Sequence, residues 1–384
     1  MPENDGMRIR SATCCLLGSL GCFPSAATRP DGGRDAGVGS APPRCEVHWW
    51  PLVEPPTVLV GLAGWGDADG PLSTARIWTP IGLALTTERN LAFADAANLS
   101  IREVDLDAGV VRTLAGSPDG YGHVDGDLVS AEFEFLLAVA SVPEGILATE
   151  VDWARDSSLG NHVRLIDLDA GIVSTMAGSS GGSKNLQNGP AQEVSLGVIF
   201  GIAAMGDAVF LADNGYDAIR VVADGGVATL AGNGTPVDRD GTGTLAGISR
   251  PTGLAAIDGG LVFTEASGVV RQVDLQGNVT TLTPVNVGGL ADGPLDAGIG
   301  LGATFGVAAD SRGNLFVADQ GNRAIRLITG GQMYTLMGDP PCADGGVGSL
   351  DPLEGFLTGI AVDDEGDVYV SDTGANRIWK LKWR

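Results

Sequence analysis

ATFGVAADSRGNLFVADQGNRAIRLITGGQMYTLMG, residues 303–338, is the stretch that decides the fold. It contains four runs of strand length, Val307–Ala309, Leu315–Ala318, Ala324–Ile328 and Gln332–Met337. Turn-forming residues separate the runs, so the stretch predicts four antiparallel strands in one up-and-down sheet. A sheet of this size leaves both faces exposed to water, and it therefore needs similar sheets as neighbours.

The last strand of that sheet has copies along the chain. Similar phrases end at residues 116, 178, 232, 284 and 338, at intervals of 62, 54, 52 and 54 residues. A further phrase, VLVGLAG at 58–64, has no strands ahead of it, whereas residues 358–383 contain three strands and no fourth. We therefore expect the N-terminal strand to complete the last sheet, which closes six four-stranded blades into a ring without open edges.

The first strand of every copy has the pattern small–apolar–alanine, as in Gly82-Leu83-Ala84 and Gly306-Val307-Ala308. Small side chains there allow wedge-shaped blades to approach one another at the axis of the ring. Ten or eleven residues further on, each of the six copies has an acid. These acids are Asp95, Glu150, Asp213, Glu265, Asp319 and Asp372.

An arginine follows these acids in most copies. Arg102, Arg220 and Arg326 each come seven residues after their acid, and Arg271 comes six residues after its own. Copy two has a seven-residue insertion before Arg164, and copy six has Trp379 at the arginine position. Catalysis needs one site, whereas these pairs recur around the ring. We therefore interpret them as structural ion pairs between buried groups.

Two of the copies carry a recognisable family pattern. GIAVDDEGDVYVSDTGANRI at 359–378 and GVAADSRGNLFVADQGNRAIR at 306–326 resemble NHL repeats. The resemblance extends over residues 57–384. It implies an all-β, six-bladed propeller of four-stranded blades in which the acids and arginines mostly hold the blades together.

The composition agrees with a repeat protein built from strands and turns. Of the 384 residues, 59 are glycine, and only 18% are charged, which is too few for a protein of long helices. The formal net charge of −24 argues against a nucleic-acid partner, because phosphate binding needs clustered lysine and arginine. We expect a monomer.

The N-terminal segment has the pattern of an export signal. In residues 7–22, MRIRSATCCLLGSLGC, a basic start precedes an apolar run shorter than the ~18 residues needed to span a bilayer. The segment resembles a bacterial lipoprotein signal, which implies lipidation of Cys22, although Ser19 stands where a branched aliphatic residue is usual. An ordinary cleaved signal is the alternative.

The expected organisation is therefore a signal at 1–22, a flexible Gly/Pro/Ala-rich tether at 23–56 and a propeller at 57–384. The expected location is the bacterial periplasm or outer-membrane surface, with a lipid anchor as the only membrane contact, or the secreted fraction. Once the signal and Cys22 are set aside, Cys45 and Cys342 remain, and an even remainder suggests a disulfide. Two independent buried thiols are the alternative.

The loops between blades contain Asp-Gly phrases that could bind calcium. They are Asp67-Ala-Asp69-Gly70, Asp125-Gly126-Asp127, Asp238-Arg239-Asp240-Gly241 and Asp292-Gly293. No phrase has the later bidentate glutamate of a calcium loop at its proper offset. Aspartate and glycine are also the usual turn residues, so turn chemistry is the favoured interpretation.

Two histidines suggest a metal site. His123 is in the loop that enters blade two, and His162 is in the insertion within blade two, so both are expected at one rim of the ring. With Glu150 and Asp125 they could form a His₂–carboxylate site for Zn²⁺ or another divalent cation. Surface histidines on a long insertion are the alternative.

Two functional hypotheses follow, and no catalytic residue is assigned. The favoured one is a non-enzymatic recognition scaffold that binds a protein or polysaccharide through the long-loop face. Trp65, Trp78 and Trp153 fall on loops of that face, where exposed aromatics would suit recognition. The alternative is a metal-dependent hydrolase or lyase at the channel and blade-two rim. Propellers of the gluconolactonase and antibiotic-lyase types imply it by fold analogy alone.

Overall fold

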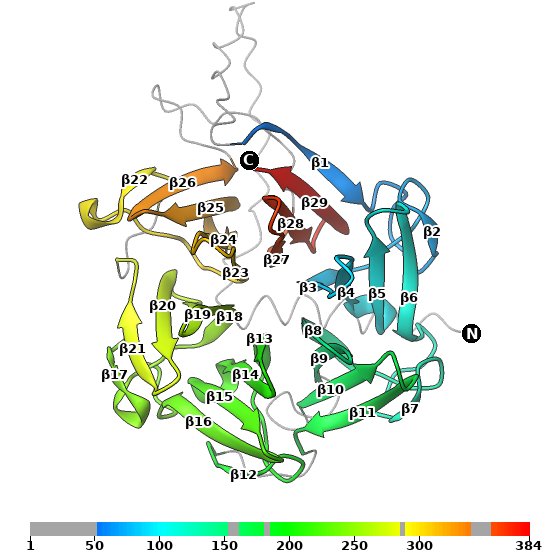
Figure 1. The fold of residues 1–384 in the computed structure, drawn as a ribbon, viewed down its shortest axis with the longest axis horizontal. Helices are drawn as coiled ribbons and strands as arrows, with labels where there is room; N and C mark the ends of the chain where they lie inside the picture. The colour runs from blue at the N-terminus through cyan, green and yellow to red at the C-terminus, as the bar shows by residue number, and fades with distance from the viewer. Residues whose placement is uncertain (1–51, 153–160, 180–184, 285–288, 339–354) are drawn as a thin grey trace, which may run out of the picture. The chain divides into compact units, whose positions relative to one another are not determined.

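The computed structural model describes residues 52–152, 161–179, 185–284, 289–338 and 355–384. All of them belong to one compact unit, His48–Arg384, in which six antiparallel sheets form a ring (Figure 1). The six-bladed propeller predicted from the repeats is confirmed. The expected signal with Cys22, the tether up to residue 51, the two further cysteines (Cys45 and Cys342) and Trp153 lie outside the described residues.

The first three blades each have four consecutive strands, ordered from the ring axis outwards (Figure 1). Blade one has β3 (Pro80–Leu85), β4 (Leu91–Asp95), β5 (Ser100–Asp105) and β6 (Val110–Gly116). Blade two has β8 (Phe135–Val142), β9 (Gly145–Val151), β10 (His162–Asp167) and β11 (Ile172–Ala177). Blade three has β13 (Ile199–Met205), β14 (Ala208–Asp213), β15 (Ala218–Ala223) and β16 (Gly226–Gly232).

The next two blades repeat this order. Blade four has β18 (Pro251–Ile257), β19 (Gly260–Glu265), β20 (Val269–Asp274) and β21 (Asn278–Thr281). Blade five has β23 (Val307–Ala309), β24 (Leu315–Asp319), β25 (Ala324–Thr329) and β26 (Gln332–Met337). The strands of blade five begin at the residues that the sequence predicted and end within one residue of the prediction.

The last blade joins the two ends of the propeller. It contains β27 (Leu357–Val362), β28 (Asp367–Asp372) and β29 (Arg377–Lys382), and β1 (Glu54–Val60) is its outer strand. β1 pairs antiparallel with β29, so the predicted closure by the N-terminal strand is confirmed (Figure 1). The strand begins at Glu54, three residues before the expected start of the propeller at 57.

Five blades also have a short fifth strand at the outer edge, which the sequence did not predict. Each is a two-residue segment of the loop that enters the blade, and it pairs with the blade's fourth strand. These strands are β2 (Gly70–Pro71), β7 (Gly126–Asp127), β12 (Gly189–Pro190), β17 (Gly241–Thr242) and β22 (Gly293–Pro294). The Asp-Gly phrases are therefore edge-strand starts as well as turns.

The described residues contain five single-turn 3-10 helices. They are η1 (Ala96–Asn98), η2 (Asn214–Tyr216), η3 (Gly243–Leu245), η4 (Leu295–Ala297) and η5 (Gln320–Asn322). Within these described parts of the chain, no helix has the length and apolar character needed to cross a membrane.

The inner strands meet around a narrow channel. Gly82 lies so close to blade two that an added Cβ would sit 2.7 Å from the Cα of Ala138, which explains the small residue at the start of this strand. The channel leaves a cavity of about 70 Å³, lined by residues of the six inner strands and by Phe305 and Gly306 just before β23.

Candidate functional site

A buried arginine joins two acids in blade one. Arg102 Nη1 lies 2.7 Å from Asp95 Oδ2 at the end of β4, and Arg102 Nη2 lies 2.7 Å from Asp69 Oδ1 in the loop that enters the blade. The side chains of Arg102 and Asp95 are fully buried, whereas Asp69 is half exposed. The arginine therefore ties the entering loop to the second strand.

Three other blades repeat this arrangement with the same atoms. The arginine–acid distances are 2.8 Å for Arg164 to both Glu150 and Asp125, 2.9 and 3.0 Å for Arg271 to Glu265 and Asp240, and 3.3 Å for Arg326 to both Asp319 and Asp292. We call each set of inner acid, arginine and outer acid a latch. The latches place the predicted acid–arginine pairs inside the blades.

Blades three and six depart from the latch. In blade three Arg220 lies 3.4 Å from Asp213, and the outer position is Asn188, whose Oδ1 accepts a hydrogen bond from Arg220 at 3.5 Å. In blade six the indole Nε1–H of Trp379 donates to Asp372 at 3.4 Å. The inner acid is thus present in all six blades, while its partner varies.

A threonine on the fourth strand completes the latch, and sequence reasoning missed it. In blade one the backbone N–H and the hydroxyl of Thr113 both donate to Asp69, at 2.9 and 3.1 Å. Equivalent hydroxyl bonds to the outer residue occur in blades two to five. The threonines are Thr113, Thr175, Thr229, Thr281 and Thr335. The sequence could have revealed these threonines, because each stands at the same place in the repeated phrase of the fourth strand.

Burial changes the acidity of the latch carboxyl groups. It raises the pKa of Asp95, Asp213, Glu265 and Asp319 above their usual range, and the neighbouring arginines lower those values only in part. For Asp125, partial burial also raises the pKa, but hydrogen bonds from Thr175 and Arg164 outweigh it and lower the pKa below its usual range. In these four blades burial therefore disfavours the ionised form of the inner acid.

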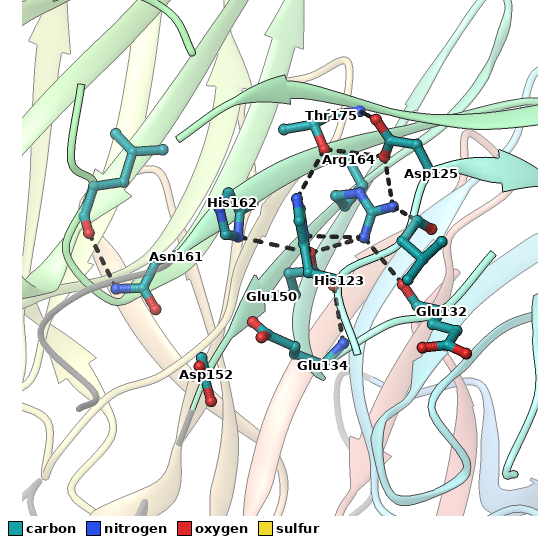
Figure 2. A network of polar contacts seen from close by, with 12 residues as sticks. His123, Asp125, Glu132, Glu134, Glu150, Asp152, Asn161, His162, Arg164 and Thr175 are labelled. Carbon is teal, nitrogen blue, oxygen red and sulfur yellow. Dashed lines mark hydrogen bonds and ion pairs between the residues drawn. The ribbon is translucent and has the colours of Figure 1, made fainter. Parts of the chain in front are cut away.

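Blade two adds two imidazoles to its latch (Figure 2). His123 comes from the entering loop, and its Nδ1 contacts Glu150 Oε1 at the end of β9. His162 begins β10 directly opposite Glu150, with its Nδ1 3.8 Å from the same oxygen. The two rings stack, with centroids 3.8 Å apart. The structure thus brings together three of the four residues predicted as metal ligands.

His123 has polar contacts at both of its ring nitrogens. The hydroxyl of Thr175 lies 3.0 Å from both Asp125 Oδ1 and His123 Nε2. Nδ1 faces Glu150 Oε1 and also lies 3.3 Å from Nη1 of Arg164. The imidazole therefore links the fourth strand of the blade to the buried acid–arginine pair of this latch.

His162 differs from its counterparts in the other blades. The residue opposite the inner acid is Ser100, Ala218, Val269 or Ala324 in blades one, three, four and five. His162 is only 3% exposed, and burial followed by the charge of His123 lowers its pKa to about 4. It is consequently neutral at pH 7 and retains a lone pair that could bind a metal.

The side chains of this cluster have the chemistry of metal ligands, but the contacts that they make now would have to change for an ion to bind. One ligand atom from each of His123, Glu150 and His162 lies within 4.8 Å of the others. Two imidazoles and a carboxylate are a typical zinc ligand set. An ion would have to compete with Arg164 for Glu150 Oε1. Asp125 is engaged by Arg164 and Thr175 and lies outside this group.

The aromatic residues predicted for binding include one close pair. The rings of Trp65 and Trp78 lie 5.1 Å apart at an angle of 42°. Trp65 is 56% exposed, while Trp78 is partly buried and its backbone N–H donates to Asp95 at 2.7 Å. The pair therefore has an exposed member and an anchored member. Trp153, the third predicted residue, is outside the described part of the chain.

Comparisons with known proteins identify the family pattern. The NHL repeat family matches residues 355–381, in the last blade. The chloroplastic protein SUPPRESSOR OF QUENCHING 1 of Arabidopsis thaliana is 28% identical over 291 residues, which are 71% of this chain and 27% of the relative. The chain thus spans about a quarter of the length of this relative.

Solved structures share the fold. Auxiliary nutrient binding proteins of Bacteroides thetaiotaomicron and Bacteroides ovatus superpose with TM-scores of 0.60 and 0.58, at 10% and 13% identity. Each superposition covers 85% of this chain, and 75% and 76% of the two neighbours. At such identities the likeness concerns the fold alone. The chain is therefore a six-bladed β-propeller with an NHL repeat in its last blade.

Proposed function

We propose that the chain is a non-enzymatic recognition scaffold that binds a polysaccharide or a protein through its long-loop face. The observation that carries the proposal is the Trp65–Trp78 pair. Exposed tryptophans are uncommon on a soluble surface, and they supply large contact area at recognition sites. Because Trp78 is held through its backbone to the inner acid of blade one, Trp65 stacks against a fixed neighbour.

The chemistry of the pair favours a saccharide over a protein. A tilted pair of indole rings presents an apolar face that suits the C–H groups of a sugar ring, and each indole N–H can donate to a hydroxyl. The fold neighbours described as auxiliary nutrient binding proteins support a binding role for a propeller of this shape. A protein partner remains the other outcome of the test below.

The channel supports a scaffold over an enzyme that works along the axis. Its cavity of about 70 Å³ is lined by glycine, alanine, aliphatic and phenylalanine residues, and Thr358 is the single polar side chain among them. The lining residues include no histidine, carboxylate, lysine, tyrosine or cysteine that could act as a general acid or base.

The test is glycan-array binding followed by titration calorimetry with the best polysaccharide. Trp65→Ala should weaken binding at least tenfold without changing the melting temperature, since its ring is exposed. Leu245→Ala removes another exposed apolar side chain, 71% exposed and in blade four, and should have no effect. If no glycan binds but Trp65→Ala abolishes capture of one envelope protein, the partner is a protein. Equal binding by both variants would disprove the tryptophan site.

A second candidate function is a metal-dependent hydrolase or lyase at the blade-two rim. The observation that favours it is the convergence of His123, Glu150 and His162. Calorimetry with ZnCl₂ should then find one ion per chain, with affinity that rises with pH because protons compete with the ion for imidazole ligands. The double variant His123→Ala/His162→Ala should lose the ion. Absence of zinc binding would remove this candidate and leave the scaffold untouched.

The proposed location is the cell envelope, or the medium if the signal is simply cleaved. The support is the sequence pattern of residues 7–22, which lie outside the described structure. Metabolic labelling with a radioactive fatty acid should mark the protein, and Cys22→Ala should abolish the label.

A further inference from the structure

Blade four has two buried carboxylate oxygens without a hydrogen-bond donor. Glu265 is fully buried, and within the described residues its Oε2 has no donor; the same is true of Asp238 Oδ1. The two carboxyl groups lie within interaction distance of each other, and within the described residues no donor reaches these two oxygens. Such oxygens cost free energy unless something positive lies between them.

The corresponding loop of blade two places a different group next to the inner glutamate than the loop of blade four does. Residues 121–124 form a parallel bridge from Tyr121 to Phe133 and an antiparallel bridge from Val124 to Glu132. The loop of blade four makes the same two bridges, from Pro236 to Ile248 and from Arg239 to Gly247. The residue just before the antiparallel bridge is therefore His123 in one blade and Asp238 in the other. A proton donor faces the glutamate in blade two, and an acceptor faces it in blade four.

Blades one and five satisfy the inner acid in another way. Asn98 Nδ2 donates to Asp95 Oδ2 at 2.8 Å and to the Gly66 carbonyl at 2.7 Å. Asn322 in blade five makes the equivalent bonds to Asp319 and the Gly289 carbonyl. Blade four is one residue shorter here and has no such asparagine. Its turn contains Ser267 instead, whose Oγ is also buried without a partner among the described residues.

The buried ion-pair set of blade four also carries more formal negative charge than that of blade five. The latch of blade five has two acids, Asp292 and Asp319, and one arginine, for a net charge of −1. In blade four Asp238 joins the latch acids Asp240 and Glu265 around the single Arg271, for a net charge of −2. One divalent cation would neutralise this set.

We propose that Asp238 and Glu265 bind one hard divalent cation, of the Ca²⁺ class, which ties the blade-four loop to the end of β19. Oxygen ligands alone suit Ca²⁺, whereas Zn²⁺ prefers nitrogen and sulfur, so this site differs chemically from the histidine cluster of blade two. The cation would take the place of the side-chain group that contacts the inner acid in the other blades, Asn98 in blade one and His123 in blade two. The ion would stabilise a loop on the same face as the tryptophan pair.

The test is calorimetry and thermal melting of the full chain with CaCl₂, together with native mass spectrometry to count bound ions. One Ca²⁺ per chain is expected, with an affinity in the range of extracellular calcium modules, roughly 10⁻⁴ to 10⁻³ M or tighter. Asp238→Asn should weaken it at least tenfold, and this variant should fold, because its amide can donate to Glu265. The double variant His123→Ala/His162→Ala should bind Ca²⁺ unchanged.

A matched control exists in blade one. Asp67 precedes Asp69 as Asp238 precedes Asp240, but it is exposed, and Asp95 already has its asparagine. Asp67→Asn should therefore leave Ca²⁺ affinity unaltered. Ca²⁺ binding that Asp238→Asn does not weaken would overturn the site. Absence of bound Ca²⁺ in both calorimetry and native mass spectra would also overturn it. If Asp238→Asn then melts above the wild type, the two carboxyl groups share a proton instead.

Discussion

The guanidinium of Arg326 lies 3.3 Å from the carboxylate of Asp319, and both side chains are fully buried. The arginine also lies 3.3 Å from Asp292 in the entering loop, 34 residues earlier in the sequence. One cation therefore stabilises both the entering loop and the end of β24. Either charge alone would be destabilising there, because both side chains are shielded from solvent. The stability of a blade that has this pair therefore depends on both members.

Removal of the acid should be strongly destabilising. In Asp319→Ala the buried guanidinium loses its inner partner, and we expect a loss of about 3–5 kcal/mol in the free energy of unfolding. Chemical denaturation measures this, and ligand binding per folded molecule should be unchanged. Asp296→Ala, an exposed acid of the same blade, is the control and should shift stability by less than ~0.5 kcal/mol. A normal denaturation midpoint for Asp319→Ala would contradict the latch.

The threonines should contribute unequally. Thr335→Val removes one hydroxyl bond, to Asp292 at 2.8 Å, and should cost about 1 kcal/mol. Thr175→Val removes the contact with His123 Nε2 as well as the bond to Asp125, so its cost should be about twice as large. Equal unfolding free energies for the two variants would show that the contact with His123 contributes nothing to stability.

Acid should destabilise the blade-two cluster through His162. Its pKa is lowered to about 4, below the ~6.5 of an unfolded histidine. As the pH falls from about 6.5 to 4, the unfolded chain takes up a proton here that the folded chain does not. Stability present at pH 7 is therefore lost across this window, by up to about 3 kcal/mol.

The measurement compares wild type with His162→Asn at pH 7 and pH 4.5. The wild type should lose more stability than the variant between these values, because the variant has no group that titrates at this position. Contributions from the buried acids are common to both proteins and cancel. Parallel pH profiles for the two proteins would refute the assignment.

Packing at the axis should make the inner glycines sensitive to substitution. In Gly82→Ala the new methyl group would lie 2.7 Å from the Cα of Ala138, so the blades would have to separate. We expect a loss of about 1–3 kcal/mol, as in other overpacked cores. Gly226→Ala is the control, since its new Cβ meets nothing nearer than 3.4 Å. Thermal melting of both variants distinguishes axial crowding from a general preference for glycine.

The sequence by itself determined the number of blades, their strands and the closure of the ring. Each blade is a local object, in which strands a few residues apart pair through short turns, so a periodic pattern such as that of 303–338 specifies it. The inner acids, Asp95 in blade one and its five counterparts, were equally visible, because six recurrences at one spacing cannot arise from a single site. The nearness of His123, Glu150 and His162 was anticipated from the side of the ring on which their loops emerge.

The tertiary structure decided what those residues contact. His123 lies 27 residues from Glu150 and 52 from Thr175, and the path of the entering loop alone brings the three together. The same path gives blade four an acceptor, Asp238, where blade two has a donor. A hydrogen bond forms or fails over less than 1 Å, whereas a repeat pattern fixes only which segment is adjacent. The repeat pattern therefore predicts the blades and their order. The paths of the loops decide which polar groups inside the blades find hydrogen-bond partners.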